Sequence, residues 1–334
     1  MRRSLARLSI PLREPFVTSD GFLSARDIVL LKLEDDDGLV GYGEAAPLPS
    51  YDGVSIDDVV DALLNGSPGP PQAQTAEEMA RLDLQARREG RALGEPGAEA
   101  IAVNRTLGAG PPDAVAARAV EGVRDGFSCF KVKVGLPDDL ERVAAVRLAL
   151  GPWPAIRLDA NGAWSAQQAI AAINELAQFD IQLVEQPCAT LEEMAEVRRA
   201  VTVPVAADES VATPADVRAA VAAEACDVVN VKLAPSGGFG AAREALREAS
   251  EHGMASYLSS TLDGPWGIAA ALQLAAAERV QMACGLATLE LFDASLARAL
   301  PPPHDGLLDV PEGPGLGVAV DDRAVAEVLV EELA

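Results

Sequence analysis

Five charged residues recur along the middle of the chain at nearly equal intervals. They are Lys133, Asp159, Glu185, Asp208 and Lys232, and the four intervals between them are 26, 26, 23 and 24 residues. Carboxylate oxygens are the ligands that Mg²⁺ prefers, and lysines can accept or donate protons. If the five side chains meet at one place, they predict a metal site flanked by acid–base groups.

Short strands are the elements that would bring these residues together. Each residue follows or ends an apolar run, namely CFKVKV, AIRLDA, IQLVEQP, VPVAADES and VVNVKLA. One strand, one helix and two loops fill such an interval, so each charged group is predicted at the carboxyl end of one of five consecutive parallel strands. In a (β/α) barrel these ends converge on one mouth, where active sites are built.

The alternation extends beyond the five residues and predicts a closed barrel. Eight strand-like runs alternate with helical runs, at 100–107, 129–135, 155–160, 181–186, 203–208, 228–233, 255–260 and 281–287. Eight such strands favour a barrel over an open sheet.

The two ends of the chain have a different pattern. Strand-like runs at 4–12, 27–34 and 39–45 predict an antiparallel sheet, with loops at 14–26 and 47–57 and helices at 75–93 and 322–333. Arg13 and Arg26 lie at these loops, without an arginine cluster. The predicted fold class is α/β, a modified (β/α) TIM-type barrel at 97–288 under an α+β capping domain made from 1–96 and 289–334.

Composition limits the classes of partner. The net charge of −24 opposes binding to nucleic acid or to an anionic membrane, and no window has the ~18 apolar residues of a membrane span. The four cysteines are scattered without a CxxC pair, which argues against a disulfide framework. We expect a cytoplasmic protein, and the oligomeric state stays open. The expectation of a small-molecule carboxylate substrate comes from the lysines and the predicted metal site.

The lysines predict the type of reaction. Lys131 and Lys133 are two residues apart on a strand, so they point to the same side, and mutual repulsion and burial are expected to lower a lysine pKa toward that of a general base. Lys232 would face them across the mouth, with Asn230 on the same face of its strand. His252 and His304 lie away from the strand ends, so zinc is disfavoured. The arrangement suits removal of a proton next to a carboxylate, with a metal stabilising the enediolate.

Several segments resemble the enolase superfamily, and within it the muconate-lactonizing subgroup. They are KVKVG, RLDANGAW, LVEQP, ADES, VVNVKLAPSGG and GYGEAAPLP, and the likeness covers nearly the whole chain. The resemblance implies Mg²⁺, with Mn²⁺ as a substitute, on Asp159, Glu185 and Asp208, and Lys133 and Lys232 as the acid–base pair. Sites of this superfamily use a lysine or histidine base with Mg²⁺ stabilising an ene-diolate, so that mechanism comes with the resemblance.

The resemblance also implies supporting and substrate-binding residues. Ser259, Ser260 and Gly285 are expected to contact substrate carboxylates, Asn161 to lie near the metal or substrate, and Glu209 to support Asp208. The full supporting set is Lys131, Arg157, Asn161, Glu209, Ser259, Ser260 and Gly285.

Within the superfamily the chain looks most like the o-succinylbenzoate synthase family of menaquinone biosynthesis. The features are the compact length, Arg157 two residues before Asp159, SST at 259–261 and ACGL at 283–286. This implies a carbon–oxygen lyase that dehydrates 2-succinyl-6-hydroxy-2,4-cyclohexadiene-1-carboxylate to 2-succinylbenzoate. Lys133 would take the proton and then assist loss of the hydroxyl, while Lys232 stabilises the enediolate.

Other functions remain open on the same scaffold. Two lysines on opposite faces suit an N-acylamino acid racemase equally well, and a muconate-type cycloisomerase is also compatible. A dipeptide epimerase is expected to carry Asp-x-Asp after the eighth strand, where GLATLELFD has none, and ASYLSST lacks the histidine of mandelate-racemase types. A barrel that only binds a partner is disfavoured by the intact set of five charged residues.

Overall fold

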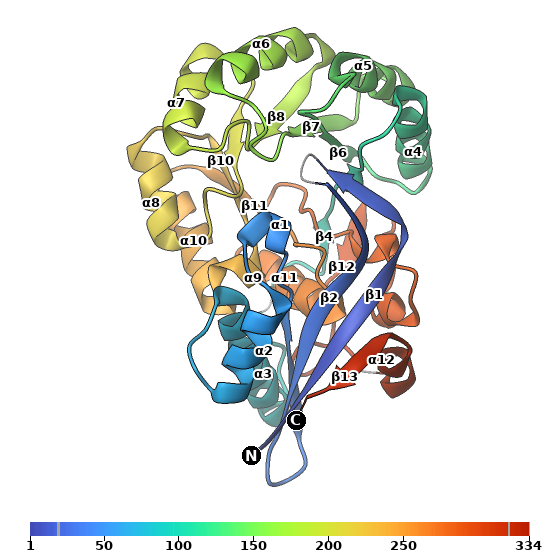
Figure 1. Cartoon of the computed structure of the whole chain (residues 1–334), viewed down its shortest axis with the longest axis vertical. Helices are drawn as coiled ribbons and strands as arrows, with labels where there is room; N and C mark the ends of the chain where they lie inside the picture. Colours follow the sequence, from blue (N-terminus) through green and yellow to red (C-terminus); the bar gives the residue numbers. More distant parts are fainter. Residues whose placement is uncertain (19–20, 96, 320, 334) are drawn as a thin grey trace.

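The computed structural model describes residues 1–18, 21–95, 97–319 and 321–333. A ring of strands and surrounding helices occupies one end of the molecule, and an antiparallel sheet with its own helices occupies the other (Figure 1). The predicted architecture of a modified barrel under a cap is confirmed.

Seven parallel strands make up most of the barrel, in the order β11-β10-β9-β8-β7-β6-β5. They are β5 (Arg105–Leu107), β6 (Cys129–Lys133), β7 (Ala155–Asp159), β8 (Ile181–Glu185), β9 (Val205–Ala207), β10 (Val228–Val231) and β11 (Ala255–Leu258). The predicted eighth strand is reduced to two bridges that close the ring. The Cys284 amide donates to the carbonyl of Ala102 at 2.7 Å, and the Gly285 amide donates to that of Leu258 at 2.8 Å.

Helices cover the outside of the strands (Figure 1). They are α4 (Pro112–Arg124), α5 (Asp139–Leu150), α6 (Ala166–Leu176), α7 (Leu191–Ala200), α8 (Pro214–Ala222), α9 (Leu233–Ser236), α10 (Phe239–Glu251) and α11 (Pro265–Ala277), with the 3₁₀ turns η1 (Ala177–Phe179), η2 (Leu289–Leu291) and η3 (Ser295–Ala299). Helices α6 and α8 begin after Ser165 and Thr213, whose hydroxyls accept the amide three residues on and complete a capping box.

The cap is built on a four-stranded sheet in the order β13-β1-β2-β3. Its strands are β1 (Arg2–Thr18), β2 (Gly21–Glu34), β3 (Val40–Ala45) and β13 (Leu329–Glu332), and its helices are α1 (Pro49–Asp52), α2 (Ile56–Asn65) and α3 (Pro71–Glu89). Successive side chains of a strand point to opposite faces. Val29 and Leu31 therefore pack with the cap helices, while Ile28 and Leu30 join the barrel core.

The C-terminal segment divides between the two parts. Strand β12 (Leu307–Asp309) pairs with β4 (Ala100–Ala102) beside the barrel, and α12 (Asp322–Val328) packs on β1. The predicted final helix is wrong beyond Val328, because residues 329–332 form the edge strand β13, which pairs with β1.

Both predicted cap loops are also wrong in part. Residues 14–18 belong to β1 and residues 21–26 to β2, and the two strands pair antiparallel, with Phe16 opposite Leu23; residues 19–20 lie outside the described part. The apolar pair of Phe16 and Leu23 extends the ladder beyond an irregularity that follows Pro11. The 47–57 segment contains α1 and the start of α2.

All four cysteines are buried and free. Within the described residues, no helix combines the length and apolar character needed to cross a bilayer.

Candidate active site

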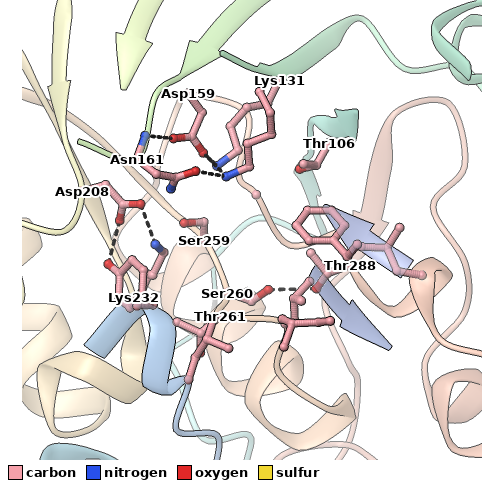
Figure 2. A pocket seen from close by; sticks show the side chains of 18 of the residues that line it. Thr106, Lys131, Asp159, Asn161, Asp208, Lys232, Ser259, Ser260, Thr261 and Thr288 are labelled. Atoms are coloured by element: carbon pink, nitrogen blue, oxygen red, sulfur yellow. Dashed lines mark hydrogen bonds and ion pairs between the residues drawn. The ribbon is translucent and has the colours of Figure 1, made fainter. Parts of the chain in front are cut away.

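A pocket opens at the carboxyl ends of the barrel strands, under the cap (Figure 2). The barrel contributes most of the polar side chains predicted for the site, and the cap contributes a largely apolar wall. The barrel residues are Thr106, Lys131, Lys133, Asp159, Asn161, Asp208, Lys232, Ser259, Ser260, Thr261, Leu262, Gly285, Thr288 and Leu291, and the cap residues are Phe16, Phe22, Leu23, Leu48, Ser50 and Tyr51.

Strand register brings the charged residues together. Lys133 is the ladder neighbour of Asp159, and Asp159 is that of Glu185, so three chemical groups stand side by side on adjacent parallel strands. Asp208 follows β9 and Lys232 follows β10, which extends the row around the mouth. The sequence spacing therefore placed all five residues correctly in space.

Lysine ammonium groups pair with all three carboxylates. Nζ of Lys131 lies 2.9 Å from Oδ2 of Asp159 and 3.2 Å from Oε1 of Glu185. Nζ of Lys133 lies 2.7 Å from the same Asp159 oxygen, and Nζ of Lys232 lies 2.6 Å from Oδ2 of Asp208. The carboxylates are at most 2% exposed, so solvent screens these pairs weakly.

Burial and the neighbouring charges shift the pKa values of the carboxylates and lysines in the site. Burial, together with the charges of Asp159 and Asp208, raises the pKa of Glu185 to about 7. Burial alone would lower the pKa of Lys131, but Asp159 and Glu185 outweigh it and raise that pKa. The expectation of a lowered lysine pKa is thus wrong for Lys131, because the neighbouring carboxylates were left out of the argument. Asp208 and Glu209 likewise outweigh burial and raise the pKa of Lys232.

The donor set suits a hard divalent cation. The three acidic groups offer only oxygen atoms, and the ammonium of Lys131 already bridges two of them, which shows that positive charge is stable between them. Across the described ranges, no three Asp, Glu, His or Cys side chains stand ready as a ligand set. Since ammonium groups occupy the carboxylate oxygens, a metal ion would have to displace them.

Glu185 lies beneath the pocket and is held from below. The Tyr257 hydroxyl donates to its Oε2 at 2.8 Å, and Nδ2 of Asn230 donates to its Oε1 at 3.0 Å. Ser259 donates to Asn230 at 2.7 Å, so this pocket residue is tied to Glu185 through an amide. Tyr257 was missed from sequence, although its spacing of two from Ser259 placed both on one face of the strand.

Arg157 lies inside the barrel and does not line the pocket. Its guanidinium donates to Gln182 and to the carbonyl of Ala283, both at 2.7 Å, and its Cζ lies 4.7 Å from the centroid of the Tyr257 ring. It can therefore act on the site only through neighbours such as Tyr257.

Asn161 links a lysine to Glu209. Its Oδ1 accepts from Lys133 at 2.7 Å, and its Nδ2 donates to Glu209 at 2.9 Å. The backbone of Asn161 has a φ of 46°, a left-handed conformation that asparagine tolerates better than most residues. Glu209 is thus placed behind the pocket wall.

Tyr51 is a cap residue that contacts two of the five charged residues, Asp208 and Lys232. Its hydroxyl donates to Oδ1 of Asp208 at 3.0 Å, and its ring centroid lies 3.9 Å from Nζ of Lys232, a cation–π contact. Burial and Asp208 raise its pKa well above the usual value. No local pattern in the sequence distinguished this tyrosine, because its partners are more than 150 residues away.

Hydroxyl groups line the pocket away from the carboxylates. The Ser260 and Thr288 hydroxyls are 2.8 Å apart and face each other in Figure 2. Gly285 passes so close to Ser259 that a Cβ on it would lie 2.7 Å from the serine Cβ. A side chain at position 285 would therefore displace the pocket wall.

Comparison with known proteins decides the family. The model of the family described as Enolase C-terminal domain-like matches residues 114–324, which include all five charged residues. The chain belongs to this family. Among curated relatives of the enolase family, the o-succinylbenzoate synthase of Thermobifida fusca is 42% identical over 72% of this chain and 74% of its own length. The L-Ala-D/L-Glu epimerase of Clostridium acetobutylicum is 31% identical over 83% and 86%.

Solved structures give the same enolase-family fold. An N-succinyl Arg/Lys racemase from Bacillus cereus superposes with a TM-score of 0.93 at 25% identity, over 99% of this chain and 98% of that one. A dipeptide epimerase from Enterococcus faecalis, solved with Mg and a dipeptide, has a TM-score of 0.88 at 29% identity, over 96% and 99%. The chain is thus an enzyme of the enolase superfamily, and relatives named o-succinylbenzoate synthase are consistent with a lyase.

Proposed function

We propose that the chain is an Mg²⁺-dependent o-succinylbenzoate synthase acting in the cytoplasm. The substrate would be 2-succinyl-6-hydroxy-2,4-cyclohexadiene-1-carboxylate, and the product 2-succinylbenzoate, an intermediate of menaquinone biosynthesis. The observation that carries the proposal is the division of the pocket into a charged end with lysines and a far end of apolar and hydroxyl side chains. The 42% identity to a curated synthase supports the same choice.

The far end of the pocket argues against a substrate that carries a positive charge. Within the described part of the chain, Asp159 and Asp208 are the only carboxylates that line the pocket, and both already pair with lysines. The ammonium of a dipeptide, or a basic side chain, would find no free acidic partner. Glu290 follows the barrel's last bridge but lines a separate groove beside Arg105.

Asp159, Glu185 and Asp208 are the residues that would hold Mg²⁺. When bound there, the ion would neutralise negative charge that develops on the substrate carboxylate. Lys131, which bridges two of these acids, would supply further positive charge nearby.

Lys133 and Lys232 would carry out the proton chemistry. Lys133 would act as the base that takes the proton from the ring carbon next to the carboxylate, and the C–H electron pair moves into an enediolate. That pair then returns to form the aromatic ring as the C–O bond breaks, and Lys133 gives its proton to the leaving hydroxyl, which departs as water. Lys232, held by Tyr51 and Asp208, places a cation across the pocket from Lys133.

Racemisation of N-succinyl amino acids is the second candidate. It is favoured by the presence of a lysine on each side of the pocket and by the TM-score of 0.93 to a racemase. The reaction differs only after proton removal, when the opposite lysine returns a proton to the same carbon.

One experiment separates the two candidates. Dehydration of the cyclohexadiene substrate, followed by absorbance with Mg²⁺ present, is run beside racemisation of N-succinyl amino acids. Fast dehydration is expected. Fast racemisation without dehydration would reject the synthase. Lys133→Ala should abolish turnover and leave Mg²⁺ binding intact, and turnover that survives in this variant would refute the role of Lys133.

A further inference from the structure

Arg26 occupies the junction between cap and barrel without entering the pocket. Its side chain is buried, at 2% exposure, and it is absent from the pocket lining. Its guanidinium donates to four backbone carbonyls. Nε donates to Thr261 at 3.0 Å, Nη2 to Ala46 at 2.7 Å, and Nη1 to Pro47 and to Asp27.

Three of these carbonyls, those of Thr261, Ala46 and Pro47, belong to segments on two different walls of the pocket. Thr261 continues directly from Ser259 and Ser260, which form the barrel wall. Ala46 and Pro47 lead directly into residues 48–51, which form part of the cap wall. A rigid, planar guanidinium with several donors can fix such carbonyls relative to one another, which a flexible ammonium does less well.

Hydrogen bonds of Asp52 hold the cap segment that carries Tyr51 in one fixed arrangement. Asp52 accepts the amides of Leu48 at 3.0 Å and Val54 at 2.9 Å and the side chain of Gln72 at 2.8 Å, so the segment after Pro47 is held as a unit. Tyr51 sits within that unit. A shift at Pro47 therefore moves the tyrosine that contacts Asp208 and Lys232.

The buried charge of Arg26 is compensated locally. Burial lowers its pKa, while the nearby Asp263 and Asp52 oppose that effect. Glu44 accepts the amides of Gly264 at 2.6 Å and Gly267 at 3.1 Å, which join this part of the cap to the start of α11. The junction thus holds its own counter-charges and does not draw on the carboxylates of the pocket.

We propose that Arg26 is a positioning residue that sets the separation of the two pocket walls, and with it the fit of the substrate. The inference rests on the proposed function only for the choice of substrate. The contacts that carry it exist in the protein without any ligand.

The test compares Arg26→Met and Arg26→Lys with Arg147→Met. Arg147 is a matched control, since it also donates to four carbonyls, those of Phe179, Gly151, Pro154 and Asp180, but it extends from α5 and lies outside the pocket. We expect Arg26→Met to raise KM for the cyclohexadiene substrate and to lower kcat/KM by up to about a hundredfold, the loss that a misplacement near 1 Å can cause. Arg26→Lys should fall between this variant and the native enzyme, and Arg147→Met should keep the native KM.

Amide hydrogen exchange without substrate gives a readout that is independent of the reaction. Arg26→Met should speed exchange in 46–54 and 260–264, and Arg147→Met should speed it in 151–154 and 179–181. The proposal is overturned if Arg26→Met keeps the native KM and exchange pattern, or if Arg147→Met raises KM as much. A protein that racemises but does not dehydrate would reject the synthase, yet the exchange measurement would still decide the role of Arg26. If Arg26→Met does not fold, Arg26→Lys carries both measurements.

Discussion

Removal of the Tyr257 hydroxyl should weaken Mg²⁺ binding without disturbing the fold. In Tyr257→Phe the ring stays under Arg157, so no cavity forms and the stacking at 4.7 Å is kept. The variant loses one donor, the hydroxyl 2.8 Å from Oε2 of Glu185. A hydrogen bond to a charged group contributes about 1.5–3 kcal/mol.

That free energy sets the expected change in affinity. Since each 1.4 kcal/mol is about a tenfold change, the Mg²⁺ dissociation constant should rise about tenfold to a hundredfold, the range found for residues that orient metal ligands. Asn230 also donates to Glu185, at 3.0 Å, so Glu185 would keep one of its two neutral hydrogen-bond donors and the loss should be partial.

Isothermal titration with Mg²⁺ measures this directly. The titration is best run near pH 8, because the pKa of Glu185 is about 7 and protons would compete with the metal at lower pH. Tyr42→Phe is the matched control, since the Tyr42 ring also lies under an arginine, Arg87, at 5.8 Å, but in the cap. An unchanged dissociation constant in Tyr257→Phe, or an equal rise in Tyr42→Phe, would show that the hydroxyl does not orient a metal ligand.

Three further predictions concern the junction, the pocket wall and the metal. Burial, and then Asp263, raises the pKa of Glu44 to about 8, which favours its protonated form in the folded protein. The resulting stability should be full below the ordinary carboxyl pKa of 4.5 and lost as pH rises through about 8, so thermal melts should show Tm falling over this window in the native protein and much less in Glu44→Gln. If Tm fell equally with pH in the native protein and in Glu44→Gln, the raised pKa would not belong to Glu44. Gly285→Ala would place a Cβ 2.7 Å from that of Ser259, so we expect a loss of about 1–3 kcal/mol in urea unfolding and a raised KM, and a native KM would count against a tight wall. Mg²⁺ at a hundred times its dissociation constant should stabilise the fold by about 2.7 kcal/mol, seen as a raised Tm, and a shift that persists in Asp208→Asn would exclude Asp208 as a ligand.

The sequence predicted the barrel and its charged row because both depend on local patterns. A strand followed by a helix fixes the interval between strand ends, and the parallel ladder then places Lys133, Asp159 and Glu185 side by side. The same period of two placed Lys131 with Lys133, and Asn230 with Lys232. These relations follow from chain geometry, so they survive folding unchanged.

The extent of the cap elements was harder to predict. Whether 14–18 and 21–26 form loop or strand depends on cross-strand pairs such as Phe16 with Leu23, and whether 329–332 is helical depends on the free edge of β1. A strand gains its hydrogen bonds from a partner that is distant in sequence, so local propensity alone does not settle such segments.

The sequence by itself thus determined which groups meet at the barrel mouth and which half-reaction they suit. Only the tertiary structure decided that Tyr51 contacts Asp208 and Lys232, that carboxylates raise the pKa of Lys131, and that Arg26 joins the two pocket walls. The physical reason is the separation along the sequence of the residues that interact. Strand spacing is set by neighbours along the chain, whereas ion pairs, burial and the approach of the cap depend on segments that only folding brings together.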